Sequence, residues 1–515
     1  MRKSFSKRQW LLTVILCLIP TVALAADEAA GEPFLQSLDS AFGQVVKVIF
    51  DILFFSIGDP DQFFGGKNGF PVIVLWLIFG ALFFTIRMGF VNFRMFGHAI
   101  DIVRGKHDDP NAPGEVTHFE ALATALSATV GLGNIAGVAI AISVGGPGAT
   151  LWMTLGGLLG MSSKFMESTL GQKYRIIKRD GKVAGGPMYY LSRGLAEIGL
   201  APLGNALAIL FSICCIFAAF GAANMFQVNQ SYGAVNEAFK DFFPIYPWAY
   251  GLVLAILVGL VMIGGIHRIG QVAGTIVPVM CVLYVVAALW ILLINFTEIP
   301  GAIGTIFQQA FSPEAVEGGV IGVIVQGLRR STFSNEAGVG SAAIAHSAAK
   351  SDRPIKEGLV ALLEPFIDTV VICNMTALVI VITGVWNDPK FEEIRKAGEG
   401  AALTSEAFGS QISWFPILLS ISVFLFAFST MISWSYYAER AWEYLFSERS
   451  LIVYRILFVI AVFIGAVAKP SSVIDFGDAT FFAMAVFNLL GMYFLTNKVL
   501  EDLNDYQNYL KQPKL

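Results

Sequence analysis

Long runs of apolar residues separated by short polar stretches make up most of the chain from residue 70 onward. A helix needs roughly twenty mainly apolar residues to cross the hydrocarbon core of a bilayer. Runs of about that length begin at Phe70, Phe119, Ala149, Leu203, Tyr250, Val272, Val320, Leu359, Trp414, Leu451 and Phe481. The pattern therefore predicts an all-α polytopic membrane protein with about eleven spanning helices.

Basic residues in the predicted loops give the orientation of these helices. If the run at Phe70 crosses inward, every second loop is basic and cytoplasmic, as the positive-inside rule requires. These loops are 87–106, 175–182, 267–268, 350–356 and 440–449. The outer loop 386–400 is a misfit, because it also carries basic residues, although glutamates lie among them.

The N-terminal region has a different pattern. Residues 1–25 combine a basic start, a short apolar run and an Ala-Leu-Ala end, which is typical of a signal peptide. Residues 26–69 are then periplasmic, and polar residues interleaved at 34–57 predict an amphipathic interfacial helix. Residues 70–117 form an additional transmembrane helix and a cytoplasmic connector.

The ten remaining helices divide into two groups of five. The groups are residues 118–296 and residues 297–497, the second with a preceding outer loop, and 498–515 is a cytoplasmic tail. Five is an odd number, so the two groups have inverted topology. The first helix of each group carries a related motif, Asn-Ile-Ala-Gly-Val at 134–138 and Asn-Glu-Ala-Gly-Val at 335–339. Paired interrupted helices are the best sequence pointer to a transporter's binding site.

The first of these motifs follows a glycine-rich stretch, 127–134, in the middle of the predicted span. Glycine weakens a helix, and unwinding in the membrane is tolerable only where the freed backbone groups bind something or line a cavity. Freed carbonyls suit a sodium ion, and freed amides at the restarting half-helix suit a carboxylate. The alternative is a glycine face for close helix packing.

The second break, 327–338, contains Arg329, Arg330 and Glu336. Charges at membrane depth are functional by default. Arg329 either pairs with Glu336 as a gate or clamp, or these charges lie in a water-filled vestibule. Phe333 is the candidate for an apolar wall over a small side chain, and the alternative is an ordinary packing aromatic.

Polar residues on three other helices are further candidates. The hydroxyls of Ser429, Thr430 and Ser433 either complete an oxygen cage for sodium or bond their own helix backbone. Trp434 shares a face with Thr430. Asn224 and Gln227 either reach the pocket or form amide bonds between helices.

Four charged positions in two further predicted helices are less specific. Lys164 and Glu167 are three residues apart and are expected to neutralise each other. Glu364 and Asp368 are candidates for a proton relay, which is the main alternative to sodium coupling.

The composition excludes several functional classes of protein. Hydrophobic residues make up 56% and charged residues 14% of the chain, and the net charge of −4 has no basic block, which argues against nucleic-acid binding. All five cysteines lie in apolar runs without metal spacing. No catalytic constellation is apparent, and the polar groups gather in the middle of the helices instead of forming a continuous pore lining. The chain is therefore expected to be neither an enzyme nor a channel, and to need no organic cofactor.

Several motifs together resemble the sodium:alanine symporter family. They are the run from Gly145 to Gly160, Val-Gly-Leu-Gly-Asn-Ile-Ala-Gly at 130–137, Thr-Phe-Ser-Asn-Glu at 332–336, and Phe-Ser-Thr at 428–430 with Trp434. The resemblance extends from about Phe70 to Leu500. Leu-Trp-Met-Thr at 151–154 departs mildly from the more aromatic family signature.

The chain is expected to lie in the bacterial inner membrane. The resemblance implies a LeuT-like 5+5 inverted-repeat fold, with Na⁺ as coupling ion and alanine or glycine as substrate. It assigns sodium to carbonyls of Ser127 and Val130 and hydroxyls of Ser429 and Thr430. It assigns the substrate to the amides of Leu132 and Gly133, with Asn134, Gln227, Phe333 and Trp434 completing the pocket. The ion and the amino acid rest on this resemblance alone. The choice among alanine, glycine, serine and D-enantiomers, the sodium stoichiometry, the oligomeric state and the removal of residues 1–25 stay open.

Overall fold

The structure is a computed structural model that describes residues 46–48, 50–57, 70–109, 111–179, 181–240, 242–263, 265–311, 319–412 and 414–512. The predicted signal segment and most of residues 26–69 lie outside the described residues. Helix continues through residue 53, and Ser56–Ile57 (β1) pairs antiparallel with Phe70–Pro71 (β2). The predicted amphipathic helix therefore does not reach Ile57, because this short sheet ties the segment to the start of the next helix. A second small sheet pairs Ile176–Ile177 (β3) with Val183–Ala184 (β4).

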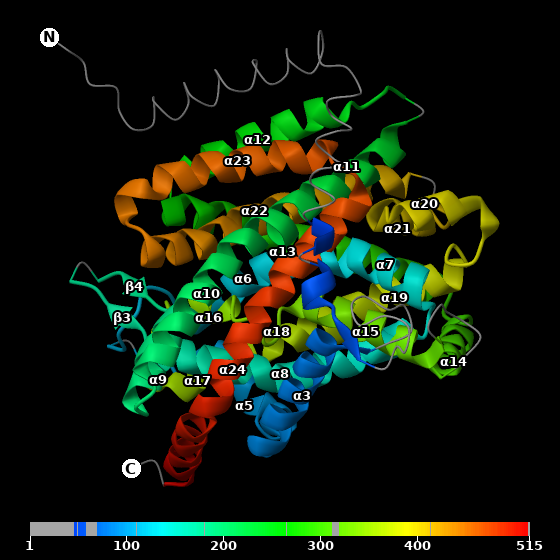
Figure 1. Ribbon diagram of the computed structural model, residues 1–515. Coiled ribbons are helices and arrows are strands. Elements are labelled where there is room, and N and C mark those ends of the chain that lie inside the picture. Colours follow the sequence, from blue (N-terminus) through cyan, green and yellow to red (C-terminus); the bar gives the residue numbers. More distant parts are fainter. Residues whose placement is uncertain are drawn as a thin grey trace, which may run out of the picture.

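A helix or a group of helices stands at each predicted apolar run (Figure 1). They are α3 (Val72–Arg87), α6 (His118–Thr129) with α7 (Val138–Gly145), α8 (Ala149–Lys173), α10 (Ala201–Phe220) with α11 (Phe226–Phe239), α12 (Pro247–Ile263), α13 (Gly265–Ile294), α15 (Gly319–Asn335) with α16 (Ala342–His346), α17 (Pro354–Ala361) with α18 (Leu363–Pro365) and α19 (Asn374–Thr383), α22 (Phe415–Leu445), α23 (Leu451–Val467) and α24 (Pro470–Lys511). By length and composition, five helices of the described chain can each cross a membrane, or up to seven if each sharply bent pair is one span. Two further apolar helices, α3 and α12, are shorter, with 16 and 17 residues.

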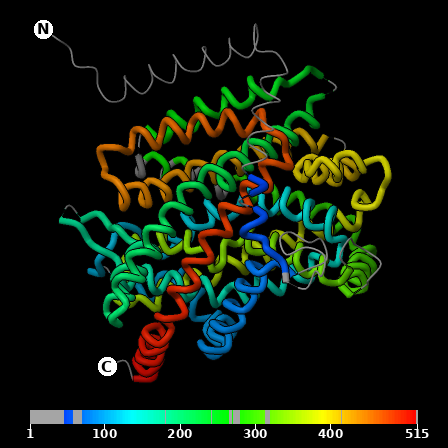
Figure 2. Tube along the Cα trace, viewed as in Figure 1, coloured from blue at the N-terminus to red at the C-terminus, as the bar shows by residue number. Residues whose placement is uncertain are grey.

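The last helix differs from the prediction at both ends. It begins at Pro470, before the expected start, and runs unbroken for 42 residues, so most of the predicted tail continues the span as helix. Figure 2 shows this red helix crossing the molecule and extending past the other elements at its C-terminal end. Buried Leu503 and Tyr506 hold the extension, and the Tyr506 hydroxyl lies 2.8 Å from His98 Nε2 on α5 (Phe96–Val103).

Irregular helix is concentrated at the centre of the fold. The helix α6 and the helical segment that restarts at Gly133 meet at 54°. Three π-helical segments lie nearby: η1 (Gly133–Gly137), η2 (Gly221–Met225) and η3 (Phe366–Cys373). A π turn inserts an extra residue into a helix and is frequent at functional sites.

The loop 386–400, whose charges did not fit the predicted topology, is largely helical. It holds η4 (Pro389–Phe391) and α20 (Glu392–Ala397) and leads into α21 (Gly400–Gly409). The helix α21 covers the first break, because Thr404 Oγ1 donates to the carbonyl of Ile135 at 3.1 Å. Two basic residues of the loop have local partners: Lys396 pairs with Glu392 at 2.6 Å, and Arg395 donates to backbone carbonyls. The smaller helices are α4 (Val91–Arg94), α9 (Pro187–Glu197), α14 (Ile299–Ala310) and η5 (Glu448–Ser450).

Candidate functional site

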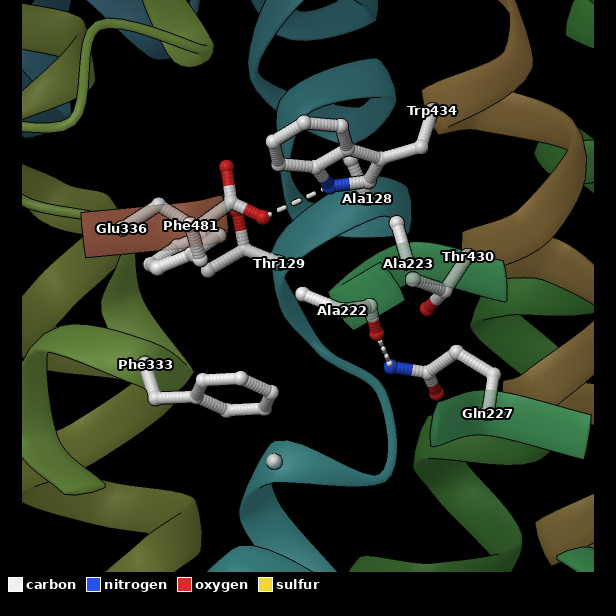
Figure 3. A pocket seen from close by; sticks show the side chains of 11 residues that line it. Ala128, Thr129, Ala222, Ala223, Gln227, Phe333, Glu336, Thr430, Trp434 and Phe481 are labelled. Carbon is white, nitrogen blue, oxygen red and sulfur yellow. Dashed lines mark hydrogen bonds between the residues drawn. The ribbon is translucent and has the colours of Figure 1, made fainter. Parts of the chain in front are cut away.

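A small cavity lies between the two helix breaks (Figure 3). It is lined by Ala128, Thr129, Gly133, Ala222, Ala223, Gln227, Phe333, Glu336, Thr430, Trp434 and Phe481. The structure therefore brings together six residues that the sequence singled out: Gly133, Gln227, Phe333, Glu336, Thr430 and Trp434. Ala222 and Ala223 belong to η2, so a π segment of α10–α11 forms part of the wall.

Glu336 is held at the cavity by two hydrogen bonds. Trp434 Nε1 donates to Glu336 Oε1 at 2.8 Å, and the Ser341 hydroxyl donates to Oε2. The backbone of Glu336 has φ 58°, a left-handed conformation that is uncommon for residues other than glycine. This conformation ends α15 and turns the side chain into the cavity, where Glu336 is the only charged lining residue in the described chain.

Aromatic rings cover the cavity. Phe333 packs against Phe481 with ring centroids 5.3 Å apart and against Phe226 at 5.0 Å. Trp434 lies 5.9 Å from Phe481. Sequence reasoning missed Phe481 because it starts an apolar run in which nothing distinguishes it from a lipid-facing residue.

The amide groups of the first break are partly occupied by side chains. Leu132 N donates to Gln227 Oε1 at 3.2 Å, and Gln227 Nε2 donates to the carbonyl of Ala222. The amide of Gly131 donates to Asn134 Oδ1 at 3.0 Å. Leu132 and Asn134, two of the predicted residues, are not among those that line the cavity.

The hydroxyls of the predicted sodium residues have different surroundings. Thr430 Oγ1 is buried at the cavity and has no hydrogen-bond partner among the described residues. The hydroxyl of Ser127 lies 2.9 Å from that of Ser433, so oxygen atoms of α6 and α22 face each other. Ser429 instead donates to the carbonyl of Phe426 on its own helix.

Two features of the backbone bring oxygen atoms of α6 and α22 together. Val130 leaves the helical conformation, with φ −75° and ψ 95°, which releases its carbonyl from the helix. A Cβ atom on Gly131 would lie 2.5 Å from Thr430 Oγ1. A side chain at position 131 would therefore displace the Thr430 hydroxyl, and glycine lets this hydroxyl lie against the first break.

The two acids proposed for a relay have separate surroundings. Asp368 accepts hydrogen bonds from Asn134 Nδ2 at 2.5 Å and from the hydroxyls of Ser334 and Thr369 at 2.8 Å each, all of them neutral donors. Glu364 instead contacts Lys164 Nζ at 3.1 Å. Lys164 is farther from Glu167, at 3.9 Å. The expected neutralisation between Lys164 and Glu167 is therefore secondary to a bond between Lys164 and Glu364.

The structure corrects the pairing considered for Arg329. Its guanidinium contacts Asp478 on α24, as does that of Arg330, and it lies over the rings of Phe50 and Phe54 at 5.1 and 4.6 Å. It does not pair with Glu336, because Glu336 points into the cavity and bonds Trp434. These contacts tie the segment 50–54 and α24 to α15, next to the Phe333 ring.

Replacing Asp478 by asparagine is expected to destabilise the protein strongly. Arg330 is buried, so losing the carboxylate leaves an uncompensated buried charge, which costs about 3–5 kcal/mol. Asp475→Asn is the matched control, because Asp475 is half-exposed and 3.9 Å from Arg329, and its loss costs at most about 1 kcal/mol. Thermal unfolding of the purified variants measures the difference. Equal melting temperatures for the two variants would contradict a stabilising role for the buried contact.

Comparisons with known proteins agree on one family. The family model described as the sodium:alanine symporter family matches residues 62–515. The sodium/alanine symporter AgcS of Methanococcus maripaludis is 40% identical over 442 residues, which are 86% of this chain and 95% of that protein. A putative sodium/proton-dependent alanine carrier protein of Bacillus subtilis, YrbD, is 34% identical over 86% of this chain and 90% of its own length.

A solved structure shares the fold. MhsT, crystallised in complex with L-phenylalanine, superposes with a TM-score of 0.51 at 16% identity, covering 74% of this chain and 88% of that one. MhsT has the LeuT fold, so the predicted fold class is confirmed. The fold and the family are those of secondary transporters and not of enzymes. With two interrupted helices around a buried cavity, and with a family match over most of its length, this chain belongs to the sodium:alanine symporter family.

Proposed function

We propose that this protein imports a small neutral amino acid, alanine first, into the cell across the bacterial inner membrane, coupled to sodium entry. The observation that carries the proposal is the cavity between the two helix breaks, which has one carboxylate, that of Glu336, and one unpartnered hydroxyl, that of Thr430. The carboxylate can pair with the ammonium group of an amino acid, and the hydroxyl can serve as a ligand for a cation.

The substrate is proposed to lie between the two breaks. Its ammonium group pairs with Glu336, and its carboxylate binds the amides of Leu132 and Gly133 at the start of the restarting half-helix. In the structure the Leu132 amide donates to Gln227 Oε1. When the substrate binds, this hydrogen bond is replaced by one from the amide to the substrate carboxylate, and Gln227 then bonds the substrate. The rings of Phe333, Phe481 and Trp434 limit the side chain to about the size of a methyl or hydroxymethyl group.

Sodium is proposed to bind behind the substrate, between α6 and α22. Its ligands are the carbonyls of Ser127 and Val130 with the hydroxyls of Thr430 and Ser429. Ser429 must rotate away from its own helix to take part. Sodium draws α6 against α22 and so orders the amides that bind the substrate carboxylate. The two ligands then raise each other's affinity equally, as linkage requires.

The test is uptake of radiolabelled alanine into proteoliposomes with sodium, potassium or proton gradients imposed in turn. We expect uptake with the sodium gradient alone, and its loss in Thr430→Val, which keeps the shape and removes the hydroxyl. Thr496→Val is the matched control, because Thr496 is also buried but donates only to the carbonyl of Met492 on its own helix. Sodium-driven uptake by Thr430→Val at the wild-type rate would remove the proposed ion site.

Proton coupling is the second candidate, and Asp368 is the residue that favours it. Its carboxylate is buried among neutral donors, where a bound proton or a cation would balance its charge. Uptake that follows the proton gradient, ignores sodium and is lost in Asp368→Asn would keep the fold and replace the coupling ion.

A further inference from the structure

A chain of buried ionisable side chains lies apart from the cavity. In order of contact it consists of His118, Glu357, His346, Glu364, Lys164 and Glu167. All are nearly inaccessible to solvent, and none lines the cavity. These six side chains connect α6, α8, α16, α17 and α18, which pack against one another (Figure 1). It lies near the starts of α6 and α17, which follow loops predicted to be cytoplasmic.

His346 occupies the centre of this chain and contacts a carboxylate at each ring nitrogen. Nδ1 lies 2.5 Å from Glu357 Oε1, and Nε2 contacts Glu364 Oε1. A neutral imidazole has one N–H group and one lone pair, so it can donate to only one of these carboxylates. The other contact would set a lone pair against a carboxylate oxygen. The geometry therefore requires a second proton, on the ring or on a carboxyl group.

The surrounding charges favour the ring as its location. The titratable and charged groups that interact with His346 or with its charged partners are His118, Lys164, Glu167, Arg175, Glu336, Glu357, Glu364 and Tyr437. Of the two carboxylates that contact His346, that of Glu364 also contacts Lys164, whereas that of Glu357 contacts a second histidine, which leaves an excess of negative charge at this point of the contact chain. A positive ring between Glu357 and Glu364 offsets part of that excess, and opposite charges at this distance stabilise each other strongly. In the described residues no group of histidine and acidic side chains is arranged to hold a metal ion instead.

We propose that His346 is a proton-binding site, in which an imidazolium held between Glu357 and Glu364 fastens α16, the inner half of the second broken helix, to α17 and α18. The effect reaches the cavity through Lys164 and Glu167. Glu167 Oε2 accepts from the amide of Gly340 at 3.0 Å, in the bend that follows Glu336. Loss of the proton sets the ring lone pair against a carboxylate and loosens α16. This site is independent of the identity of the transported substrate and of its coupling ion.

The bound proton can be observed directly. The chain has five histidines, so ¹⁵N solid-state NMR of histidine-labelled protein in lipid gives few ring signals, and His346→Gln identifies the signal of His346. We expect both ring nitrogens of His346 to be protonated when the pH is about one to two units above the ordinary histidine pKa of about 6.5. A neutral His346 ring under these conditions overturns the proposal. If His346→Gln does not fold, removing the other histidines one at a time makes the same assignment.

A second variant tests the role of the two carboxylates. Glu357→Gln removes one negative partner, and the pH at which the ring loses its second proton is expected to fall by about 1–3 units. Glu501→Gln, on the exposed inner end of α24, is the control and should leave that pH unchanged. An unchanged midpoint in Glu357→Gln would show that the carboxylates do not hold the proton.

Transport provides the functional readout. At constant external pH and sodium, uptake is expected to decline as the internal pH rises through the range in which the ring loses its proton. In Glu357→Gln the decline should begin at lower pH, in step with the NMR midpoint. Uptake that is constant across the titration of His346 contradicts the fastening of α16 by the proton.

Discussion

Replacing Gly133 by leucine is expected to abolish alanine uptake while the protein still inserts into the membrane. Gly133 lines the cavity, and the two breaks meet there: a Cβ atom on Gly133 would lie 3.1 Å from Ser334 Cα. The neighbour is backbone and cannot rotate away, so the larger side chain fills the cavity or separates the breaks. Extra carbons in a packed site cost about 1–3 kcal/mol, and here they also occupy the space of the substrate.

The measurements are alanine uptake in proteoliposomes and the amount of folded protein in the membrane. Gly304→Leu is the matched control, because Gly304 is exposed on α14 and nothing lies within 4 Å of its built Cβ. That variant should transport at the wild-type rate. Normal alanine uptake by Gly133→Leu would place the substrate elsewhere.

Glu336→Gln is expected to raise the KM for alanine about 10–100-fold, the equivalent of a lost charge-assisted hydrogen bond of about 1.5–3 kcal/mol. The amide keeps the shape of the side chain and an oxygen that accepts from Trp434, but it has no charge to pair with the substrate ammonium. The measurement is the concentration dependence of uptake at saturating sodium.

Ser341→Ala separates this effect from simple disorder of the second break. It removes the donor to Glu336 Oε2 and leaves the carboxylate in place, so KM is expected to change by less than about 10-fold. If Glu336→Gln keeps the wild-type KM, or if Ser341→Ala has the larger effect, Glu336 is a structural residue of the break and not a substrate ligand.

The two helix breaks were predictable because their causes are local. Glycines in the middle of an apolar run permit an irregular backbone, and Gly338 and Gly340 adopt positive φ of 80° and 96° at the second break. The related motifs beginning at Asn134 and Asn335 mark corresponding breaks, and the LeuT fold is confirmed. The proposed ligand roles of residues at the breaks stay predictions.

Pairings between charges were not predictable. Arg329 and Glu336 are seven residues apart and would share a face of a continuous helix. The left-handed conformation of Glu336 ends that helix and turns the carboxylate into the cavity, so Arg329 bonds Asp478 on α24 instead. Lys164 likewise lies closer to Glu364 than to its neighbour Glu167, because α18 packs against α8.

By itself, the sequence determined the membrane class, the places of the helices and the positions of the two breaks. These depend on apolar run length and on glycine, which act within about twenty residues. Resemblance added the family, the ion and the amino acid. Only the tertiary structure decided that Phe481 covers the cavity, that α21 closes over the first break and that His346 lies between two carboxylates. Those contacts join residues far apart in the chain, and a buried charge takes whatever partner packing brings to it.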